Sequence, residues 1–342
     1  MQVVKFGGSS VKNAENINKV VAIVNEKIKT DTTIVVVSAL GGITDILLQC
    51  CHLASEGNET YKDKLLESEQ RHLQTVKELI PITEQSRILS LVKTLCNEIE
   101  DICTGIFLLG ELSDRTRDRM VSYGEILSSQ IISAKFKSQG EGSEWKDSRE
   151  LIITDSNFGA AAVDFMSTNA KLLDYFKVPE SNLFILPGFI ASNENGITTT
   201  LGRGGSDYTA AIIAAALDSK VLEIWTDVSG MMTADPRLVN NVKIIPQISY
   251  QEAMELSHFG AKVIYPPTIQ PVSTKGIPTW IKNTFAPNDI GTIIQKETTV
   301  NGSSIRGISS INSISLLSLE GSGMVGIPGF SKKLFEANWC TD

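Results

Sequence analysis

The N-terminal part of the chain alternates short apolar runs with longer amphipathic ones. Val3–Phe6 is apolar except at Lys5, and Ile34–Val37 is an unbroken β-branched run, as expected of strands buried on both faces of a sheet. Each run is followed by a glycine pair and then by apolar residues at helical spacing. After the first pair these positions are Ile17, Val20, Val21, Val24 and Ile28. The repeated order of strand, glycine turn and helix predicts parallel strands joined by helical crossovers.

Later segments extend this pattern. Residues 58–110 are polar, poor in glycine and helical in pattern, which predicts a helical insertion beside the active-site face. A further helix is expected over Val121–Phe136. Two predicted strands, Leu183–Ile190 and Ile197–Leu201, flank Asn195-Gly196, a strong signal for a hairpin with a two-residue turn.

A buried strand at Val221–Trp225 and a helix at Ser249–Ser257 carry the pattern to about residue 295. The predicted fold class is therefore α/β, with a mainly parallel central sheet and helices on both faces. Beyond it, Ser313–Leu319 is strand-like and leads into residues 321–326, which satisfy the GxGxxG pattern of dinucleotide-binding folds. Only 16 residues follow Gly326, too few to complete a βαβ unit. A dehydrogenase is therefore the least supported functional hypothesis.

Composition narrows the classes of function. The 342 residues are 42% hydrophobic and carry a net charge of −8, which argues against a nucleic-acid-binding protein. Five cysteines without CxxC spacing indicate free thiols in a reducing compartment, and three scattered histidines indicate no metal cluster. No signal peptide and no apolar run of about 20 residues are apparent, so we expect a cytoplasmic protein.

Two glycine-rich turns are candidate anion sites. Residues 202–207 join three glycines, Arg203 and Asp207, and they run directly into an apolar helical segment that ends at Leu217. Residues 5–11 place Lys5, Gly7-Gly8 and two serines between a strand and a helix. Glycines let backbone N–H groups approach an anion at the positive end of a helix, and a guanidinium suits a carboxylate or phosphate. Together the turns suggest a phosphoryl donor and an anionic acceptor.

Six motifs in fixed order resemble aspartokinases, members of the amino acid kinase family. The resemblance covers about residues 1–295 and is closest to the kinase half of bifunctional aspartokinase–homoserine dehydrogenases. The motifs are Lys5-Phe6-Gly7-Gly8-Ser9-Ser10-Val11, Ser122-Tyr123-Gly124-Glu125, Gly202-Arg203-Gly204-Gly205-Ser206-Asp207, Trp225-Thr226-Asp227-Val228, Ala234-Asp235-Pro236-Arg237 and Phe259-Gly260-Ala261-Lys262-Val263.

This resemblance implies an amino acid kinase fold and a reaction of ATP with L-aspartate that gives ADP and 4-phospho-L-aspartate, the first step toward lysine, threonine and methionine. Mg²⁺ is implied to bridge phosphate oxygens, although the sequence assigns no metal ligand. A carboxylate acceptor is already ionised at neutral pH, so no general base is required. Homo-oligomerisation and fusion to homoserine dehydrogenase in a parent chain are further implications.

The resemblance also implies three segments: a catalytic domain at 1–295, a linker at 296–304 and a truncated ACT-like β–α fragment at 305–342. Because that fragment is too short to build the paired ACT domains of the family, we expect no inhibition of this chain by lysine or threonine.

Roles for individual residues follow from the matched motifs. Lys5, Asp207 and Lys262 are the implied catalytic residues, with Lys5 and Lys262 on the transferred phosphate. The implied substrate contacts are Ser38, Thr44, Glu125, Arg203 and Ser206. The implied nucleotide contacts are Lys5, Gly7, Gly8, Ser9, Thr226, Asp227, Met232, Asp235, Arg237 and Lys262. Many aspartokinases have a tyrosine where this chain has Met232, which predicts weaker stacking on the adenine.

Several alternatives remain open. Lys262 also suits a helix C-terminus, Ser38 and Thr44 suit local caps, and an isolated helical glutamate such as Glu125 usually faces solvent. At the level of the whole chain, one rival is a kinase of the same fold that acts on acetylglutamate, glutamate or a nucleoside monophosphate. The other is a nucleotide-binding regulatory protein without turnover.

Overall fold

A computed structural model describes residues 1–258, 263–298 and 305–311, together with the single residues 314, 329, 332 and 335. It divides into two compact units, Met1–Ser309 and Ser310–Asp342. Several sequence predictions lie wholly or partly outside the described residues. They are the position of Lys262, the predicted linker beyond residue 298 and most of the predicted ACT-like fragment at 305–342, including the glycine pattern at 321–326 and, except for Ile314, the strand at 313–319.

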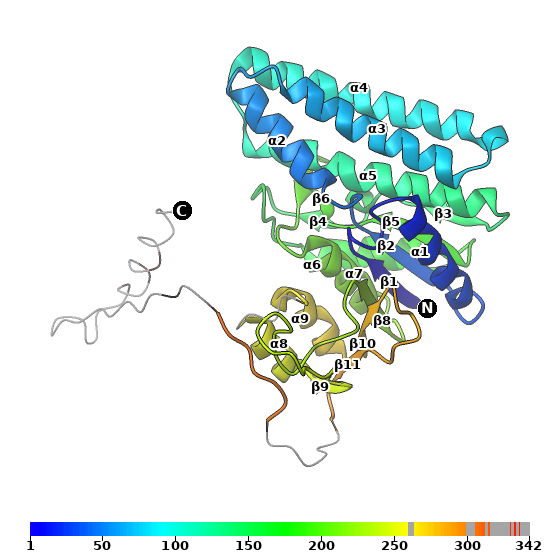
Figure 1. Ribbon diagram of the computed structural model, residues 1–342, viewed down its shortest axis with the longest axis vertical. Coiled ribbons are helices and arrows are strands. Elements are labelled where there is room, and N and C mark those ends of the chain that lie inside the picture. The colour runs from blue at the N-terminus through cyan, green and yellow to red at the C-terminus, as the bar shows by residue number, and fades with distance from the viewer. Residues whose placement is uncertain are drawn as a thin grey trace. The chain divides into compact units, whose positions relative to one another are not determined.

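An eight-stranded sheet forms the centre of the first unit (Figure 1). The strand order is β3-β5-β2-β1-β8-β10-β11-β9, and every neighbouring pair is parallel except β10 with β11. The mainly parallel sheet predicted from the sequence is therefore confirmed. The strands are β1 Gln2–Phe6, β2 Thr33–Val37, β3 Ser143–Trp145, β5 Leu183–Pro187, β8 Leu222–Thr226, β9 Gln247–Ser249, β10 Thr279–Asn283 and β11 Thr292–Gln295.

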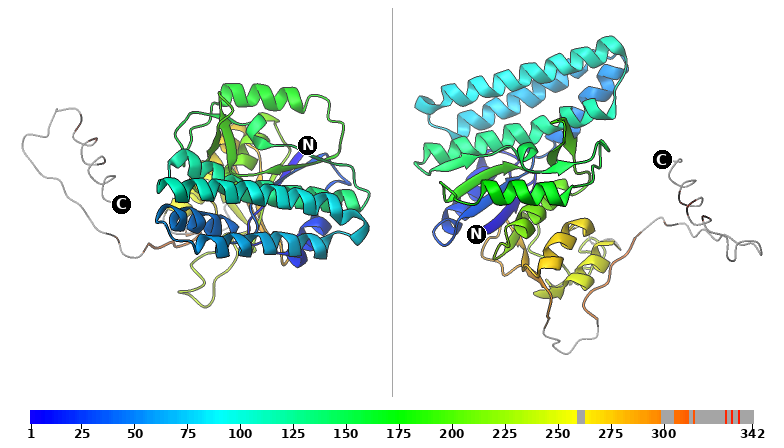
Figure 2. Two further views of the ribbon diagram at one scale, coloured as in Figure 1. Left: turned by 90° about the horizontal axis from the view of Figure 1, so that it is seen from above. Right: turned by 180° about the vertical axis from the view of Figure 1, so that it is seen from behind.

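Helices cover both faces of the sheet, as predicted (Figures 1 and 2). On one face α1, α2 and α5 lie nearest the sheet and α3 and α4 form an outer layer; α6, α7, α8 and α9 lie on the other side. The helices are α1 Ala14–Lys27, α2 Ile43–Ser55, α3 Tyr61–Leu79, α4 Gln85–Leu109, α5 Asp114–Ser138, α6 Phe165–Tyr175, α7 Gly205–Ala216, α8 Tyr250–His258 and α9 Pro266–Lys275, with short 3-10 turns η1 Ile82–Glu84 and η2 Ser148–Glu150.

The period of two in β1 divides its side chains between two hydrophobic cores. Val4 and Phe6 pack into the core shared with α1–α5. Val3 packs into the core beneath α7. Lys5 therefore points to the α7 side of the sheet, although its neighbours in sequence are apolar. This alternation places a cation in the interior at the carboxyl end of the central strand.

The segment 183–190, predicted as one strand, is two strands in two sheets. β5 ends at Pro187, and β6 Ile190–Asn193 joins a second sheet with β4 Ile153–Thr154 and β7 Thr198–Thr200. The chain changes sheet at Gly188-Phe189, where Phe189 adopts φ 67°. Its N–H donates to Thr209 Oγ1 at 2.9 Å and its carbonyl accepts from Leu201 N at 2.9 Å. These tertiary contacts hold a backbone conformation that a phenylalanine rarely adopts.

The predicted hairpin around Asn195-Gly196 exists between β6 and β7, but its loop has three residues. Asn193 N–H donates to the carbonyl of Ile197 at 3.0 Å, which leaves Glu194, Asn195 and Gly196 as the loop. Gly196 adopts φ 72°. A left-handed residue at the end of a three-residue loop is the usual way to close it, so the glycine was recognised correctly and the loop length was wrong.

Residues 58–110 contain α3 and α4, in agreement with the predicted helical pattern. The helix predicted to begin at Val121 starts earlier, at Asp114 of α5, because Ser113 caps it by accepting from the N–H of Thr116 at 3.2 Å. Among the residues that the structure describes, none of these helices is both long and apolar enough to cross a membrane.

Candidate active site

Two glycine turns touch at the carboxyl ends of β1 and β2. Gly7-Gly8 follows β1, and Gly41-Gly42 lies between β2 and α2. A Cβ atom at Gly41 would lie 2.9 Å from the carbonyl oxygen of Gly8, and one at Gly8 would lie 3.4 Å from the carbonyl oxygen of Ala39. Side chains here would separate the turns, so glycine is needed for their close approach. The result is one backbone surface built from both turns.

Lys5 extends from β1 to the first turn of α7, on the same side of the sheet. Its ammonium forms an ion pair with Asp207, and the two side chains are only 10% and 14% exposed. Lys5 Nζ also lies 3.4 Å from the place that a Cβ of Gly7 would occupy. A buried lysine requires an anionic partner, and Asp207 supplies it from within the chain. The pair holds the cation beside the first glycine turn.

Glu125 approaches the same region from α5. Gly124 makes this possible, since a Cβ there would lie 2.9 Å from Cβ of Ala39. Glu125 is 4% exposed, and its Oε2 has no hydrogen-bond partner among the described residues. Burial raises the pKa of its carboxyl group from 4.5 to about 8, against the backbone N–H groups of Ala39 and Glu125 and the charge of Lys5. Glu125 is thus an internal residue, and the alternative of a solvent-facing glutamate is wrong.

The second glycine-rich motif forms the entry to α7. Gly204 caps the helix at φ 70°, and a Cβ there would lie 2.5 Å from Cβ of Tyr265. Arg203 is exposed and forms no ion pair within the described part of the chain. Ser206 is buried against Gly188, where a Cβ would lie 2.7 Å from that of the serine. The motif therefore presents one unpaired guanidinium beside a tightly packed helix start.

Ser38 and Thr44 lie on either side of the Gly41-Gly42 turn. The Ser38 N–H donates to Phe6 O at 3.2 Å, and its carbonyl accepts from Ser128 Oγ at 2.6 Å. Thr44 lies in the first turn of α2, whose N-cap Gly42 has φ 84° and no capping side chain. The N–H of Ile43 donates to Leu40 O at 2.9 Å. The next N–H groups of α2, those of Thr44 and Asp45, receive no capping side chain and face the positive end of the helix. The side chains of Ser38 and Thr44 are half-buried, and neither caps a helix.

The predicted nucleotide contacts follow β8, the neighbour of β1. Gly7 N–H donates to Trp225 O at 3.2 Å, which places Thr226 and Asp227 next to the first glycine turn. Farther along, Arg237 pairs with Asp235 at 2.7 Å and keeps the pKa of that carboxyl at about 2.

The Arg237 side chain is 78% exposed, and Met232 is half-buried. No hydrogen bond or ion pair between described residues joins Asp235 or Arg237 to the Lys5 cluster. The structure thus brings Lys5, Glu125, Asp207 and both glycine turns together, and it leaves the Asp235–Arg237 pair on a separate surface loop.

Sequence reasoning missed two charged residues near these elements. Arg71 of α3 donates from Nη2 to the carbonyl oxygen of Gly41 at 2.7 Å, so it fastens the second glycine turn to the outer helical layer. Asp118 of α5 is 1% exposed and accepts from the N–H of Gly159 and from the N–H and hydroxyl of Thr200, each at 2.9 Å. Each is a single charge on a polar helix, and no local motif distinguishes it.

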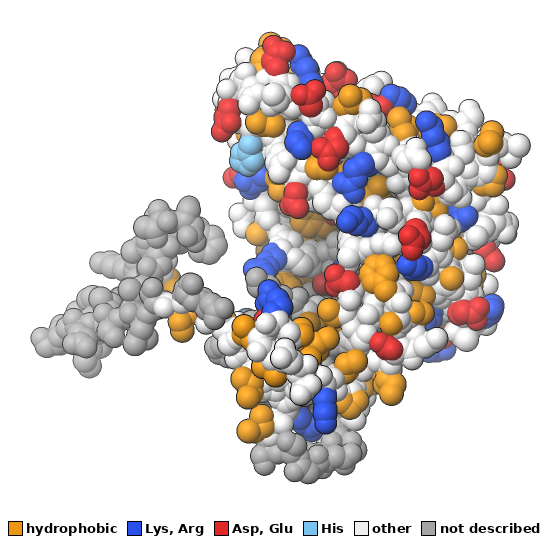
Figure 3. Space-filling view, viewed as in Figure 1, with side chains coloured by type: hydrophobic (Ala, Val, Ile, Leu, Met, Phe, Trp, Pro, Cys, Tyr) orange, Lys and Arg blue, Asp and Glu red, His pale blue; other side chains and the backbone are white. Residues whose placement is uncertain are grey.

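A surface hollow lies below the helical layer, and both basic and acidic side chains border it (Figure 3). Within the described ranges, no group of three or more His, Cys, Asp or Glu side chains is arranged to hold a metal ion. The local chemistry is therefore that of an anion site: uncapped helix starts, glycine turns and a buried lysine around a buried carboxyl group.

Comparison with known proteins agrees with this geometry. Residues 1–283 match the model of the amino acid kinase family, and the chain belongs to that family. A bifunctional aspartokinase/homoserine dehydrogenase 1, chloroplastic, of Arabidopsis thaliana is 34% identical over 339 residues, covering 97% of this chain and 37% of the relative. A bifunctional aspartokinase/homoserine dehydrogenase of Buchnera aphidicola is also 34% identical, over 98% of this chain and 41% of the relative.

A solved structure of E. coli aspartokinase III in complex with aspartate and ADP superposes with a TM-score of 0.80 at 33% identity, covering 87% of this chain and 65% of that one. The fold is thus the amino acid kinase fold seen in aspartokinases. The chain spans about two fifths of the length of the bifunctional relatives that it matches.

Proposed function

We propose that this chain is an aspartate kinase, which transfers the γ-phosphoryl group of ATP to the side-chain carboxylate of L-aspartate. The observation that carries the proposal is the buried cluster of Lys5, Asp207 and Glu125 against two touching glycine turns. Support comes from the likeness to an aspartokinase whose solved complex contains aspartate and ADP.

In this proposal the aspartate carboxylate oxygen attacks the γ-phosphorus while the bond from that phosphorus to the bridging oxygen of ADP breaks. The protein contributes position and positive charge rather than covalent chemistry. Lys5, oriented by Asp207, faces the transferred group, and Gly7, Gly8 and Ser9 offer backbone and hydroxyl donors. Lys262 is proposed as a second cation there.

The amino acid is proposed to bind between Arg203 and Glu125. Arg203 forms no ion pair with a carboxylate of the described residues, and it presents a planar fork to the α-carboxylate. The charges of Lys5, Asp207 and an ionised Glu125 sum to −1, so the α-ammonium would neutralise the cluster. It would also draw the pKa of Glu125 down from about 8 and keep the carboxylate ionised in the complex. Ser38, Thr44 and Ser206 complete the proposed substrate contacts.

ATP is proposed to lie along the end of β8, with Thr226 and Asp227 at the nucleoside and Met232, Asp235 and Arg237 beyond it. Mg²⁺ would neutralise phosphate charge. A cation held mainly by phosphate oxygens and water needs only one or two protein carboxylates, which agrees with the lack of a ligand cluster among the described residues. Arg237 would have to exchange its pairing with Asp235 for a phosphate.

We also propose that residues 1–295 form the catalytic domain and that a linker and an ACT-like fragment follow it. The protein is further proposed to be cytoplasmic, to form homo-oligomers and to belong to a parent chain that continues into homoserine dehydrogenase. The last has support from the names of the bifunctional relatives.

The test is formation of aspartyl hydroxamate from ATP, Mg²⁺, L-aspartate and hydroxylamine by the purified chain. We expect hydroxamate and ADP in equal amounts, with no product from acetylglutamate, glutamate or uridine monophosphate in matched ADP-release assays. If ADP release depended on one of those acceptors instead, that acceptor and not aspartate would be the substrate. Nucleotide binding without any acceptor-dependent turnover would favour a regulatory protein.

A further inference from the structure

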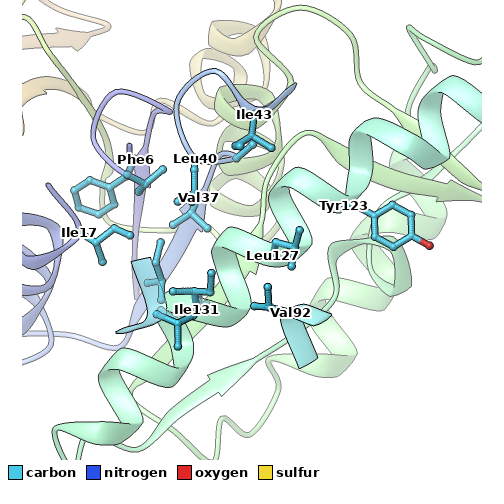
Figure 4. Packing of buried hydrophobic residues seen from close by; sticks show 14 of the residues in the cluster. Phe6, Ile17, Val37, Leu40, Ile43, Val92, Tyr123, Leu127 and Ile131 are labelled. Atoms are coloured by element: carbon cyan, nitrogen blue, oxygen red, sulfur yellow. The ribbon is translucent and has the colours of Figure 1, made fainter. Parts of the chain in front are cut away.

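A cavity of about 460 Å³ lies beside α5, and Glu125 is not among the residues that line it. Its walls come from α4, α5, the short turn η2 and the β6–β7 hairpin, and it is called here the arginine cavity after Arg115, Arg119 and Arg149. None of its lining residues is among the proposed substrate or nucleotide contacts. Figure 4 shows Tyr123 of α5 at the margin of the hydrophobic cluster, with its hydroxyl turned away from Leu127 and Ile131.

The charge in this cavity is positive and only partly compensated. Arg149 is neutralised by Asp147 at 2.6 Å, but neither Arg115 nor Arg119 forms an ion pair with a described residue. Glu98 is the acidic residue of the lining, and it accepts from the Tyr123 hydroxyl at 2.7 Å. The lining therefore keeps an excess positive charge in a protein whose net charge is −8.

The cavity also has an apolar part. Leu95 and Ile102 of α4 and Ile126 of α5 line it beside the guanidinium groups. Its volume falls in the range of small-molecule sites, roughly 300–1,000 Å³, which typically combine apolar walls with a few fixed polar groups. A guanidinium recognises a carboxylate or phosphate through paired N–H donors. The chemistry that fits is a small organic anion with an apolar body.

We propose that the arginine cavity is a second ligand site, which binds a small organic carboxylate or phosphate with its anionic group at Arg115 and Arg119 and its apolar body on Leu95, Ile102 and Ile126. The proposal does not depend on aspartate being the substrate, because binding there is measured without turnover.

The probe is 4-fluorophenylacetate, titrated against the full chain and followed by fluorine NMR. We expect saturable binding with Kd of about 0.1–10 mM, as for a ligand of this size. The double variant Arg115→Gln/Arg119→Gln should weaken it at least about tenfold, since two charge-assisted contacts are lost. The matched control Arg87→Gln, an exposed arginine of α4 outside the cavity, should leave Kd unchanged.

Two further probes separate the parts of the proposal. The amide 4-fluorophenylacetamide lacks the negative charge, and fluoroacetate lacks the aromatic ring. Each should bind at least about tenfold more weakly than 4-fluorophenylacetate. Equal binding by the double variant, or loss of binding in Arg203→Gln instead, would place the probe elsewhere and overturn the proposal. An apparent Kd that rises with protein concentration would show that a second copy of the chain fills the cavity, which also overturns it.

Discussion

Lys5 stands between two apolar residues of a central strand, and its charge is held in the interior by Asp207. If it stabilises charge that develops on the γ-phosphoryl group, removal of the ammonium should affect the transition state more than substrate binding. We expect Lys5→Met to lower kcat by about 10²–10³-fold with little change in the KM for aspartate, the size seen when one electrostatic contact is lost. Steady-state kinetics in the hydroxamate assay measure both constants.

The control for Lys5 is Lys29→Met, an exposed lysine after α1, which should behave like the original chain. Circular dichroism separates lost folding from lost catalysis, because Lys5→Met leaves Asp207 buried without its partner. A folded variant with near-normal kcat would show that Lys5 has a structural role and does not stabilise the transferred phosphoryl group.

Arg203 differs from Lys5 because it is exposed and has no ion-pair partner in the part of the chain that the structure describes. Lysine keeps its charge but lacks the planar fork, so Arg203→Lys should raise the KM for aspartate by about tenfold or more and leave the KM for ATP nearly unchanged. Arg87→Lys serves as the matched control on α4. A shift in the ATP constant instead would assign Arg203 to the phosphates and reverse the proposed orientation of the substrate.

At the scale of elements, one hydrogen bond links the outer helical layer to the Gly41-Gly42 turn, which lies beside the proposed substrate contacts Ser38 and Thr44. Arg71 Nη2 donates to the Gly41 carbonyl at 2.7 Å, and Gly41 in turn lies against Gly8. Arg71→Ala should therefore lower kcat/KM for aspartate by about 10–100-fold, the range expected for a lost hydrogen bond to a charged group, while the helices persist.

Added guanidinium should restore part of the activity of Arg71→Ala and none to Arg203→Lys. This rescue distinguishes a lost contact at the turn from general damage to α3. If Arg71→Ala kept full kcat/KM, the outer helices would have no part in positioning the Gly41-Gly42 turn.

The elements themselves were largely predictable, because glycine pairs, β-branched runs and helical spacing are local signals. The change of sheet at Gly188-Phe189 was not, since it depends on Thr209 and Leu201, which are distant in sequence. For the same reason the glycine turns and Lys5 were predicted from their motifs, whereas Arg71 and Asp118 were not. Their partners, mainly backbone groups together with the Thr200 hydroxyl, reach them only in the folded chain.

At the scale of the whole molecule, the buried carboxyl of Glu125 links stability to pH. Its pKa is raised from 4.5 to about 8 by burial, so between these values the folded chain holds a proton that the unfolded chain has released. The free energy of unfolding should therefore fall as pH rises across this window. Glutamine resembles the protonated carboxyl group and has no proton to lose, so Glu125→Gln should not share this loss.

We accordingly expect Glu125→Gln to melt close to the original chain at pH 5 and on the order of 5 °C above it at pH 8, as measured by calorimetry without ligands. The exposed Glu100→Gln should show no such divergence. L-Aspartate at saturation should reduce the gap at pH 8 by stabilising only the original chain, because the proposed α-ammonium contact favours the ionised carboxylate. A difference in melting temperature that stays constant from pH 5 to pH 8 would show that Glu125 is ionised throughout, despite its burial.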